Sequence, residues 1–379
     1  MSLRGVLAAL ARPTLGHLDP FFVSLMDDIK RLLQYALQTR NELTFAVSAP
    51  GSAGMESCFV NLMEPGDKVI VCQNGVFGGR MYENVLRAGG QAVLVEDPWG
   101  SAVDPQKLSD ALKKHPDTKI VAFVHAETST GVQSDVQLLT EIAHGYQCLV
   151  IVDAVTSLGG IPLKIDEWQV DAVYSGSQKC LSCVPGLSPL SFGPRAVEKI
   201  RQRKSKVQSW FLDVNLVMAY WGSEQKRSYH HTAPVNSLYA LHEALVILKE
   251  EGLENACARH DLHHRALRAG LEAMGLKYWV DAAIRLPQLN TIRVPAGVDE
   301  AAVRRVFLND FNLEIGAGLG VLAAKVWRIG LMGYTSQKKN VLLCLAAFEA
   351  TLSQYAGSIT TGKAILAAEQ VYLSTPGKV

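Results

Sequence analysis

Short runs of apolar and β-branched residues recur through the first half of the chain, and polar or mixed stretches separate them. Near-continuous apolar runs are typical of strands that are buried on both faces of a mainly parallel sheet. The clearest runs cover residues 69–72, 92–95, 120–124, 149–152 and 172–174. Between them, segments 105–113 and 136–143 repeat apolar residues with the 3.6-residue period of an amphipathic helix. This alternation, from about residue 44 to 195, predicts a doubly wound α/β domain.

The pattern changes after about residue 236. The elements predicted there are a helix over 238–249, a strand over 289–294, a helix over 300–307, a turn at Asn312, a strand over 326–329 and a helix over 339–352. This mixture predicts a smaller α+β domain. We therefore expect a large domain over residues 1–250 and a small domain over residues 251–379.

Composition changes this picture mainly by excluding classes of partner. The 379 residues carry a formal net charge of +1, so charge gives no argument for binding a nucleic acid or a membrane surface. No apolar run approaches the roughly 20 residues that a membrane helix needs, and the first residues lack the pattern of a signal peptide. The seven cysteines do not resemble a disulfide framework. We expect a soluble cytoplasmic protein with no nucleic-acid or membrane partner.

Two groups of residues have a superficial similarity to metal sites. Cys180 and Cys183 have the spacing of a zinc or redox motif, but no second cysteine pair or matching histidine pair completes it. We interpret both as ordinary buried or loop thiols. His260, His263 and His264 lie in a helical stretch without an acidic partner, and we expect them on a solvated helix face. No metal site is predicted.

A lysine and an aspartate give the strongest chemical signal in the chain. Lys179 ends the run Ser-Gly-Ser-Gln-Lys directly after a short apolar strand, and Asp153 ends another such strand. In α/β proteins such strand ends lie on the ligand-binding edge of the sheet. A desolvated lysine amine can form a Schiff base with an aldehyde, and a facing aspartate can keep a pyridine nitrogen protonated. Together they indicate a site for pyridoxal phosphate.

A possible phosphate site comes earlier in the chain. Residues 50–56, Pro-Gly-Ser-Ala-Gly-Met-Glu, follow a strand-like segment and open a helix rich in small residues. Small side chains let a phosphate approach the free backbone N–H groups at the positive end of the helix dipole. An ordinary helix start has the same pattern, so the motif alone is weak evidence. The presence of Asp153 and Lys179 makes a phosphate site the better interpretation. We expect this segment to bind the cofactor phosphate.

Several motifs along the chain are similar to those of one enzyme family. They are Gly-Ser-Ala at 51–53, Asn-Gly-Val-Phe-Gly at 74–78, His-Ala-Glu-Thr-Ser-Thr-Gly at 125–131, Val-Asp-Ala-Val-Thr-Ser at 152–157, the lysine run at 175–179, Tyr-His-His-Thr-Ala-Pro at 229–234 and Trp-Arg-Ile-Gly at 327–330. From near residue 5 to about 355 the chain resembles the class V, fold-type I pyridoxal phosphate aminotransferases. Within them it looks most like the alanine–glyoxylate and serine–pyruvate group.

The resemblance implies a fold and an activity. The large domain would be built on a mainly parallel seven-stranded sheet, with a smaller α+β domain at the C-terminal end. The protein would be a transaminase that moves an amino group from alanine or serine to glyoxylate or pyruvate.

The family pattern also implies a role for each matching residue. Lys179 would carry the cofactor as a Schiff base, the internal aldimine, and move the proton during transamination, while Asp153 would pair with the pyridinium. Arg328 would bind the substrate carboxylate through its two-pronged guanidinium, with Thr128 and His17 also near the substrate. The residues implied in cofactor binding are Gly51, Ser52, Ala53, Phe77, Thr128, Asp153, Val155, Gln178, Lys179, Tyr229 and Thr232.

A homodimer with shared sites is implied as well. In relatives, the residues that match Tyr229 and Thr232 reach into the site of the other subunit, so that neither site is complete alone. We interpret His230 and His231 as interface or structural histidines. Relatives begin with a Gly-Pro-rich loop near the substrate carboxylate, and we expect this chain to start beyond that loop, with a shortened N-terminal segment.

Alternative functions stay open at this point. The stretch from 327 to 364 resembles ureidoglycine–glyoxylate aminotransferases, but that branch typically has Gln where this chain has His17 and Asn where it has Tyr229. A catalytically silent dimer that uses the fold as a scaffold is the non-enzyme alternative. Cysteine desulfuration needs a catalytic cysteine loop that the sequence does not place.

Overall fold

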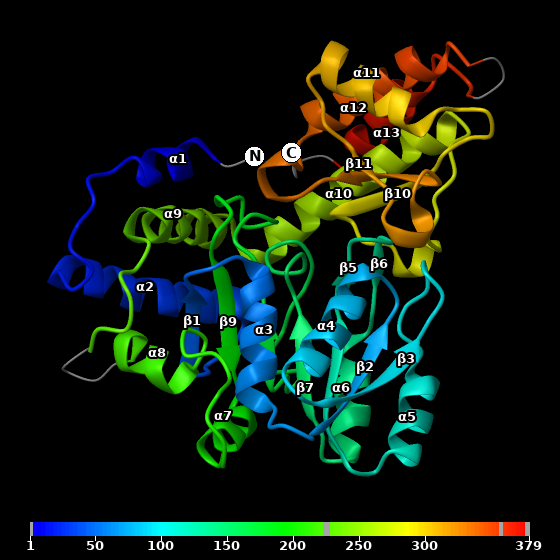
Figure 1. The fold of residues 1–379 in the computed structure, drawn as a ribbon. Helices are drawn as coiled ribbons and strands as arrows, with labels where there is room; N and C mark the ends of the chain where they lie inside the picture. Colours follow the sequence, from blue (N-terminus) through cyan, green and yellow to red (C-terminus); the bar gives the residue numbers. More distant parts are fainter. Residues whose placement is uncertain (1–2, 223–227, 356–358, 376–379) are drawn as a thin grey trace.

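The large domain is built on a seven-stranded sheet whose parallel strands point toward the small domain (Figure 1). The computed structural model describes residues 3–222, 228–355 and 359–375. Within these residues the strand order is β1 (Leu43–Val47), β9 (Ser188–Phe192), β8 (Ala172–Tyr174), β7 (Leu149–Asp153), β4 (Thr118–Val124), β2 (Lys68–Gln73) and β3 (Gln91–Glu96). Strand β9 runs antiparallel to both of its neighbours, and the pairs from β8 to β3 are parallel. The predicted α/β fold with a mainly parallel sheet is confirmed.

Helices surround this sheet. The helices of the large domain are α1 (Arg4–Leu10), α2 (Pro20–Leu37), α3 (Gly51–Leu62), α4 (Val76–Arg87), α5 (Pro105–Lys114), α6 (Val136–Gly145), α7 (Pro194–Arg201), α8 (Val214–Trp221) and α9 (Val235–Glu251). Helix α3 packs on β8 and β9, and α4 packs on β2, β3 and β4. In the part of the chain that the structure describes, no helix has both the length and the apolar character needed to cross a membrane.

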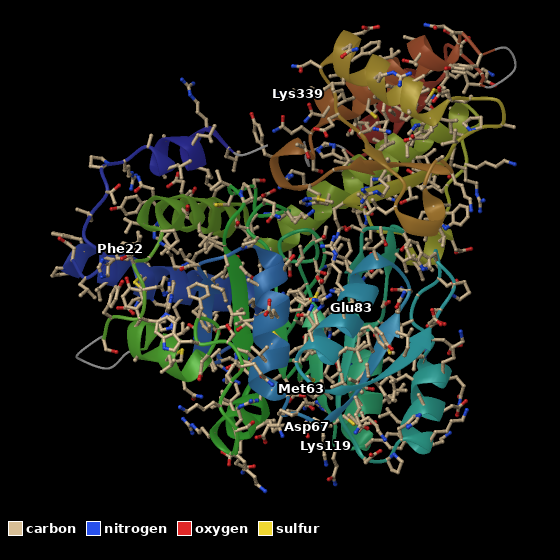
Figure 2. The ribbon with its side chains drawn as sticks, viewed as in Figure 1. Phe22, Met63, Asp67, Glu83, Lys119 and Lys339 are labelled. Carbon is tan, nitrogen blue, oxygen red and sulfur yellow. The ribbon has the colours of Figure 1, made fainter. Side chains whose placement is uncertain are left out.

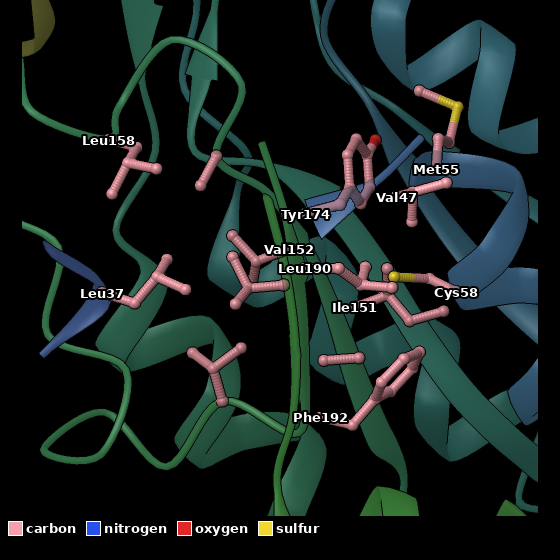
Figure 3. Packing of buried hydrophobic residues seen from close by; sticks show 14 of the residues in the cluster. Leu37, Val47, Met55, Cys58, Ile151, Val152, Leu158, Tyr174, Leu190 and Phe192 are labelled. Carbon is pink, nitrogen blue, oxygen red and sulfur yellow. The ribbon is translucent and has the colours of Figure 1, made fainter. Parts of the chain in front are cut away.

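The core of the large domain lies on both faces of the sheet. Figure 3 shows Leu37 and Leu158 on one face, and Met55, Cys58 and Phe192 on the other. All five side chains are at most 3% exposed. Because successive residues of a strand point to opposite faces, a continuous apolar run fills both layers at once. This packing fixes the strand ends where the site is built.

The C-terminal part has its own core. Its three-stranded antiparallel sheet has the order β10 (Leu289–Arg293), β12 (Val326–Gly330) and β11 (Gly316–Ala317). Its helices are α10 (Leu253–Ala273), α11 (Glu300–Phe311), α12 (Lys338–Leu352) and α13 (Ala364–Leu373). One hydrophobic cluster runs from Val6 to Ala256 and a second from Leu262 to Tyr372, and Figure 2 shows side chains filling both parts. We retain a domain boundary near residue 250 as a proposal.

Individual elements follow the sequence closely, with one difference in burial. The predicted turn at Asn312 ends α11, and Asn312 adopts the left-handed conformation with φ 49°. Strand β3 lies at the edge of the sheet, and its outer residues Gln91 and Glu96 are exposed. Within the predicted run 92–95, Ala92, Val93 and Leu94 are half-buried, so the prediction that this strand is buried on both faces is wrong. An edge strand has a neighbouring strand on one side only.

The three histidines of α10 are buried, so the predicted solvated helix face is wrong. Helix α10 packs against α12 and α13, and its three histidines have partners in three different segments: Gly333 for His260, Tyr372 of α13 for His263 and Asn290 of β10 for His264. His260 Nε2 accepts a hydrogen bond from the Gly333 N–H at 2.9 Å, and His263 Nδ1 lies 2.9 Å from the Tyr372 hydroxyl. Internal partners of this kind let a polar ring be buried. Burial lowers the pKa of His260 and of His263 to about 4, so both rings stay neutral near pH 7.

Cys180 and Cys183 are free and buried, which confirms their interpretation as ordinary thiols. Burial raises the pKa of each thiol to about 12. Both therefore stay protonated and unreactive near neutral pH, because the thiolate is the reactive form.

Candidate active site

A pocket of about 230 Å³ lies at the carboxyl edge of the large sheet, where β4, β7 and β8 end. It is lined by Pro50, Gly51, Ser52, Met55, Phe77, Arg80, Val124, Ala126, Thr128, Asp153, Val155, Thr156, Tyr174, Gln178 and Lys179. The strand ends and helix starts that the sequence analysis singled out are thus brought together in one place.

Lys179 lies on the loop that follows β8. Backbone hydrogen bonds close this loop, from the Ser182 N–H to the Lys179 carbonyl at 3.0 Å and from the Cys183 N–H to the Ser177 carbonyl at 3.1 Å. Burial lowers the pKa of the Lys179 amine, and the positive charge of Arg328 lowers it further. A lowered pKa increases the fraction of neutral amine, which is the nucleophilic form.

Asp153 ends β7 and is 3% exposed. Its Oδ1 accepts the Val155 N–H at 2.8 Å and its Oδ2 accepts the Tyr174 hydroxyl at 2.7 Å. Tyr174 occupies the paired position on β8, so the parallel register places the hydroxyl beside the carboxylate. Burial raises the pKa of Asp153 to about 6, although both hydrogen bonds oppose the increase. A cation in the pocket would stabilise the ionised form.

The N-terminus of α3 faces the pocket through Gly51 and Ser52. No side chain caps this helix start. A Cβ on Gly51 would lie 3.3 Å from both the Ser175 carbonyl and the Val155 side chain, a tight contact that glycine avoids, so the backbone can approach closely without displacing its neighbours. Ala53 does not line the pocket, and its N–H already donates to the Pro50 carbonyl at 2.8 Å. Free N–H groups and the helix dipole at such a start can bind an anion.

Arg328 reaches the same edge from the small domain. It lies on β12, where its Nε donates to the Ala317 carbonyl at 2.7 Å and its Nη1 donates to the Thr128 carbonyl at 3.1 Å. Thr128 lines the pocket, so this second bond joins the small domain to the rim of the site. The half-buried guanidinium remains charged near neutral pH and can bind a carboxylate in a bidentate manner.

Sequence reasoning missed Arg80, which also lines the pocket. Its guanidinium carbon lies 4.9 Å from the centre of the Phe77 ring, one helical turn earlier on α4. The i, i+3 spacing of Phe77 and Arg80 was the available signal, because such residues share a helix face. Arg80 is exposed, so its charge is largely solvated.

Besides Ala53 and Arg328, three more predicted site residues do not line this pocket, namely His17, Tyr229 and Thr232. These three lie apart from it. They form a group of their own, in which the rings of His17 and Tyr229 are 5.2 Å apart and the hydroxyls of Tyr229 and Thr232 are 3.4 Å apart. Tyr229 is 62% exposed. His230 and His231 lie 2.7 Å apart through their Nδ1 atoms in the same region. Within one chain, this group is separate from Lys179.

The pocket residues fit the pyridoxal phosphate that the resemblance implies. Asp153 supplies a buried carboxylate for the ring nitrogen, and Lys179 supplies an amine with a lowered pKa. The uncapped start of α3, with Gln178 beside it on the pocket wall, suits a phosphate. Phe77 and Val155 provide apolar surface for a ring.

A larger groove, about 1110 Å³, lies at the amino edge of the sheet and does not include these groups. Its buried carboxylate, Asp171, already has several partners. Asp171 accepts the Val150 N–H at 2.9 Å and the Arg195 guanidinium at 3.4 Å, and it lies 2.9 Å from His144. We place the active site in the smaller pocket because a buried carboxylate, Asp153, and a half-buried lysine, Lys179, both line it.

Comparisons with known proteins agree with this geometry. The family model for class-V aminotransferases matches residues 8–341. The solved alanine–glyoxylate aminotransferase from Nostoc sp. is 46% identical, with a TM-score of 0.91 over 93% of this chain and 92% of that chain. The solved ureidoglycine–glyoxylate aminotransferase from Bacillus subtilis is 37% identical, with a TM-score of 0.95 over 98% and 95%. The alanine–glyoxylate aminotransferase of Rattus norvegicus is 41% identical over 88% of this chain and 81% of its own length.

Because Asp153 is buried, we expect the free energy of unfolding of the cofactor-free protein to depend on pH. The unfolded chain ionises this carboxyl near its ordinary pKa of 3.8, whereas burial raises the folded-state pKa to about 6. Stability is therefore lost as the pH rises from about 4 to above 6, by up to about 3 kcal/mol. Asp153→Asn removes this term, so its stability advantage over the unmodified protein should grow by about 1 to 2 kcal/mol between pH 5 and pH 8. Urea unfolding at both pH values measures this, and an advantage that does not change with pH would contradict it.

Proposed function

Because the chain belongs to the class-V aminotransferase family, we propose that it moves the amino group of alanine or serine to glyoxylate or pyruvate, with pyridoxal phosphate as cofactor. The transaminase activity follows from the family match and from alanine–glyoxylate aminotransferases that are 40% and 41% identical over most of the chain. The observation that carries the proposal is that Lys179, Asp153 and Thr128 line one pocket, and that Arg328 is bound to the Thr128 carbonyl.

Each of these residues has a task in transamination. When bound, pyridoxal phosphate supplies a protonated ring that withdraws electrons from the substrate Cα. Ionised Asp153 keeps the ring nitrogen protonated, because a nearby negative charge raises the pKa of that nitrogen. Lys179 Nζ would remove the proton from the substrate Cα and deliver it to the cofactor carbon C4′, and the lowered pKa of the amine favours the removal. Arg328 binds the substrate carboxylate with the N–H groups that Ala317 and Thr128 do not use.

Replacing the lysine tests the transaminase proposal. We expect Lys179→Ala to lower the rate of alanine–glyoxylate transamination by at least about a thousandfold, because one residue supplies both the cofactor attachment and the proton transfer. The matched control is Lys119→Ala, which removes an exposed lysine at the far end of β4 (Figure 2). Steady-state kinetics at saturating cofactor give the comparison. Similar rates for both variants would reject the role of Lys179.

The choice of substrate rests on His17 and Tyr229. These two positions distinguish this chain from the ureidoglycine branch, which typically has Gln and Asn there. The contact between the two rings, 5.2 Å between centroids, supports the view that they act as one unit in selecting the substrate. An imidazole and a phenol offer fewer hydrogen-bonding groups to a ureido group than two carboxamides do. We therefore propose that ureidoglycine is not the preferred amino donor.

Charge supports a small amino donor. Arg328 is the carboxylate-binding group whose donors are fixed by neighbouring carbonyls. Arg80 is a second cation on the pocket wall, but it is exposed, and a solvated charge gives little net stabilisation to an ion pair. A distal carboxylate of glutamate or aspartate would thus be desolvated at a cost of several kcal/mol.

A donor screen tests this preference. With glyoxylate as acceptor, we expect alanine or serine to give a kcat/KM at least about tenfold above those of glutamate and ureidoglycine. Pyruvate should be a slower acceptor, because the glyoxylate aldehyde is less hindered. Arg80→Gln tests whether the exposed cation takes part in binding a carboxylate, and we expect it to leave kcat/KM for alanine within about twofold. Ureidoglycine as the best donor would reject the substrate proposal. Glutamate as the best donor would reject the view that Arg328 alone binds a substrate carboxylate.

We also propose a homodimer with shared sites. Tyr229 and Thr232 are exposed and lie away from the pocket of their own chain, which is what residues that serve the partner's site require. Trp210, 63% exposed, stacks on His230 beside them at 4.5 Å between ring centres. Exposed aromatic residues gathered in this way are typical of protein interfaces. A second copy of the chain is the partner that the shared-site proposal needs.

Subunit mixing tests this arrangement. Lys179→Ala and Tyr229→Ala homodimers should both have low activity, and mixing them under conditions of subunit exchange should restore activity. One of the two sites in each heterodimer then contains both intact residues, so recovery should approach about a quarter of the unmodified activity. Native mass spectrometry confirms the exchange. Confirmed heterodimers without recovered activity would contradict shared sites.

Ureidoglycine–glyoxylate transamination is the second candidate function. The TM-score of 0.95 with the Bacillus subtilis enzyme favours it, and the residues at positions 17 and 229 oppose it. A catalytically silent scaffold is disfavoured because Asp153 and Lys179 are both present and both line the pocket. A cytoplasmic location stays part of the proposal, and it is supported by seven free cysteines.

A further inference from the structure

Glu127 is a buried carboxylate that the proposed chemistry does not use. It ends the short strand β5 (Ala126–Glu127), which pairs with β6 (Val132–Gln133), and its side chain is fully buried. Among the described residues it forms no ion pair within 4 Å, so no basic side chain neutralises it directly. A buried charge without a cation is costly unless hydrogen bonds satisfy it.

Four hydrogen bonds satisfy Glu127. Its Oε1 accepts the N–H of Ser129 at 3.0 Å and the hydroxyl of Ser129 at 2.6 Å. Its Oε2 accepts the N–H of Phe77 at 3.1 Å and, more weakly, the N–H of Gly78 at 3.4 Å. Burial raises the pKa of Glu127, and the four hydrogen bonds oppose that increase. All four partners donate, which favours the ionised carboxylate, since that group only accepts.

The donors at positions 77 and 78 belong to the first turn of α4, which has no cap of its own. The residue before the helix is Gly75, which has no side chain to accept these N–H groups. Instead, the Ser129 hydroxyl accepts the Val76 N–H at 2.9 Å while Glu127 accepts the next two. The turn at 127–129 therefore caps α4 from a different part of the chain, and a negative charge at a helix N-terminus is favourable.

The surroundings of Gly75 show how closely the 127–129 turn packs against the start of α4. A Cβ at this position would overlap the Glu127 side chain and the Ser129 hydroxyl oxygen. The backbone of Gly75 is extended, with φ 178°, so any residue could adopt its conformation. Glycine is required there for space rather than for backbone freedom, which indicates that the carboxylate is held tightly against the helix start.

The same turn contacts the two sides of the site. Phe77, whose N–H Glu127 accepts, lines the pocket. Thr128, the next residue after Glu127, lines the pocket too, and its carbonyl accepts the Arg328 guanidinium at 3.1 Å. A single carboxylate thus connects the helix that presents Phe77 with the turn that holds Arg328.

We propose that Glu127 is a positioning residue that fixes Phe77 and Arg328 relative to each other, with Ser129 completing the cap. Without the carboxylate, the first turn of α4 and the 127–129 turn lose their common anchor, so the pocket wall and the carboxylate clamp move independently. The proposal rests on the proposed function for the roles of Phe77 and Arg328, but the cap itself is a property of the cofactor-free chain.

Hydrogen exchange of the cofactor-free protein tests the cap directly. We expect Glu127→Gln to increase amide exchange in peptides covering 76–78 by at least about tenfold, because an amide at that place cannot accept from all four donors. Ser129→Ala, which keeps the charge and removes the Val76 acceptor, should increase exchange in the same peptides. The control is Asp171→Asn, which removes a buried carboxylate that accepts the Val150 N–H at the other edge of the sheet. It should leave exchange at 76–78 unchanged.

Ligand binding tests the consequence for the site. We expect Glu127→Gln to raise the Kd for pyridoxal phosphate and the KM for alanine by about ten- to a hundredfold, with a smaller change in kcat, while Asp171→Asn leaves both constants within about twofold. Altered visible circular dichroism of the bound cofactor in Glu127→Gln, but not in Asp171→Asn, is the matching spectroscopic signature.

The outcomes separate this inference from the proposed function. Unchanged exchange at 76–78 in both Glu127→Gln and Ser129→Ala would overturn the cap, whatever the enzyme's substrate is. Increased exchange together with an unchanged cofactor Kd and alanine KM would overturn the positioning role. A protein that binds no pyridoxal phosphate in its unmodified form would overturn the proposed function, while the exchange result would still decide the cap.

Discussion

The whole site depends on keeping the carboxylate of Asp153 buried at the end of β7. The parallel pairing of β7 with β8 places Tyr174 beside Asp153. The Tyr174 hydroxyl therefore donates to the Asp153 carboxylate at 2.7 Å. The Val155 N–H, at the point where the chain leaves the strand, satisfies the other oxygen. Burial still raises the pKa of the group to about 6, so the folded chain holds an ionised aspartate at a cost near neutral pH. Such a cost is typical of functional sites, where ligand binding rather than folding benefits from the charge.

The rest of the fold maintains this arrangement. Apolar side chains on both faces of the sheet fix the strand ends (Figure 3), and the start of α3 approaches them closely because Gly51 has no side chain. The small domain, which has a separate core, contributes Arg328. The hydrogen bond from Arg328 to the Thr128 carbonyl joins the two parts, and Glu127, one residue earlier, anchors that turn to α4. The proposed cofactor and substrate contacts and the contact between the two parts of the chain therefore lie within a few residues of β5.

Much of this could be predicted from sequence because the signals are local. Apolar runs predicted the strands, Asn312 marked the end of α11, Asp153 ended one strand, and Lys179 lay in the short loop after another. What could not be predicted depends on distant partners. His260 has polar neighbours in the sequence but is fully buried and accepts the N–H of Gly333, a residue 73 positions away. The capping role of Glu127 requires knowing that α4 lies beside β5. Helix α2 was missed although Asp19 and Pro20 carry a clear start signal, with the Asp19 carboxylate accepting the Phe21 N–H.

The central claim is that Lys179 holds the cofactor opposite Asp153, and the point of attachment can be measured directly. The protein is incubated with pyridoxal phosphate, reduced with borohydride, digested and mapped by mass spectrometry. The account predicts a single stoichiometric adduct on Lys179, formed less efficiently below about pH 6, where Asp153 becomes protonated. An adduct on another lysine, or none at any pH, would contradict it.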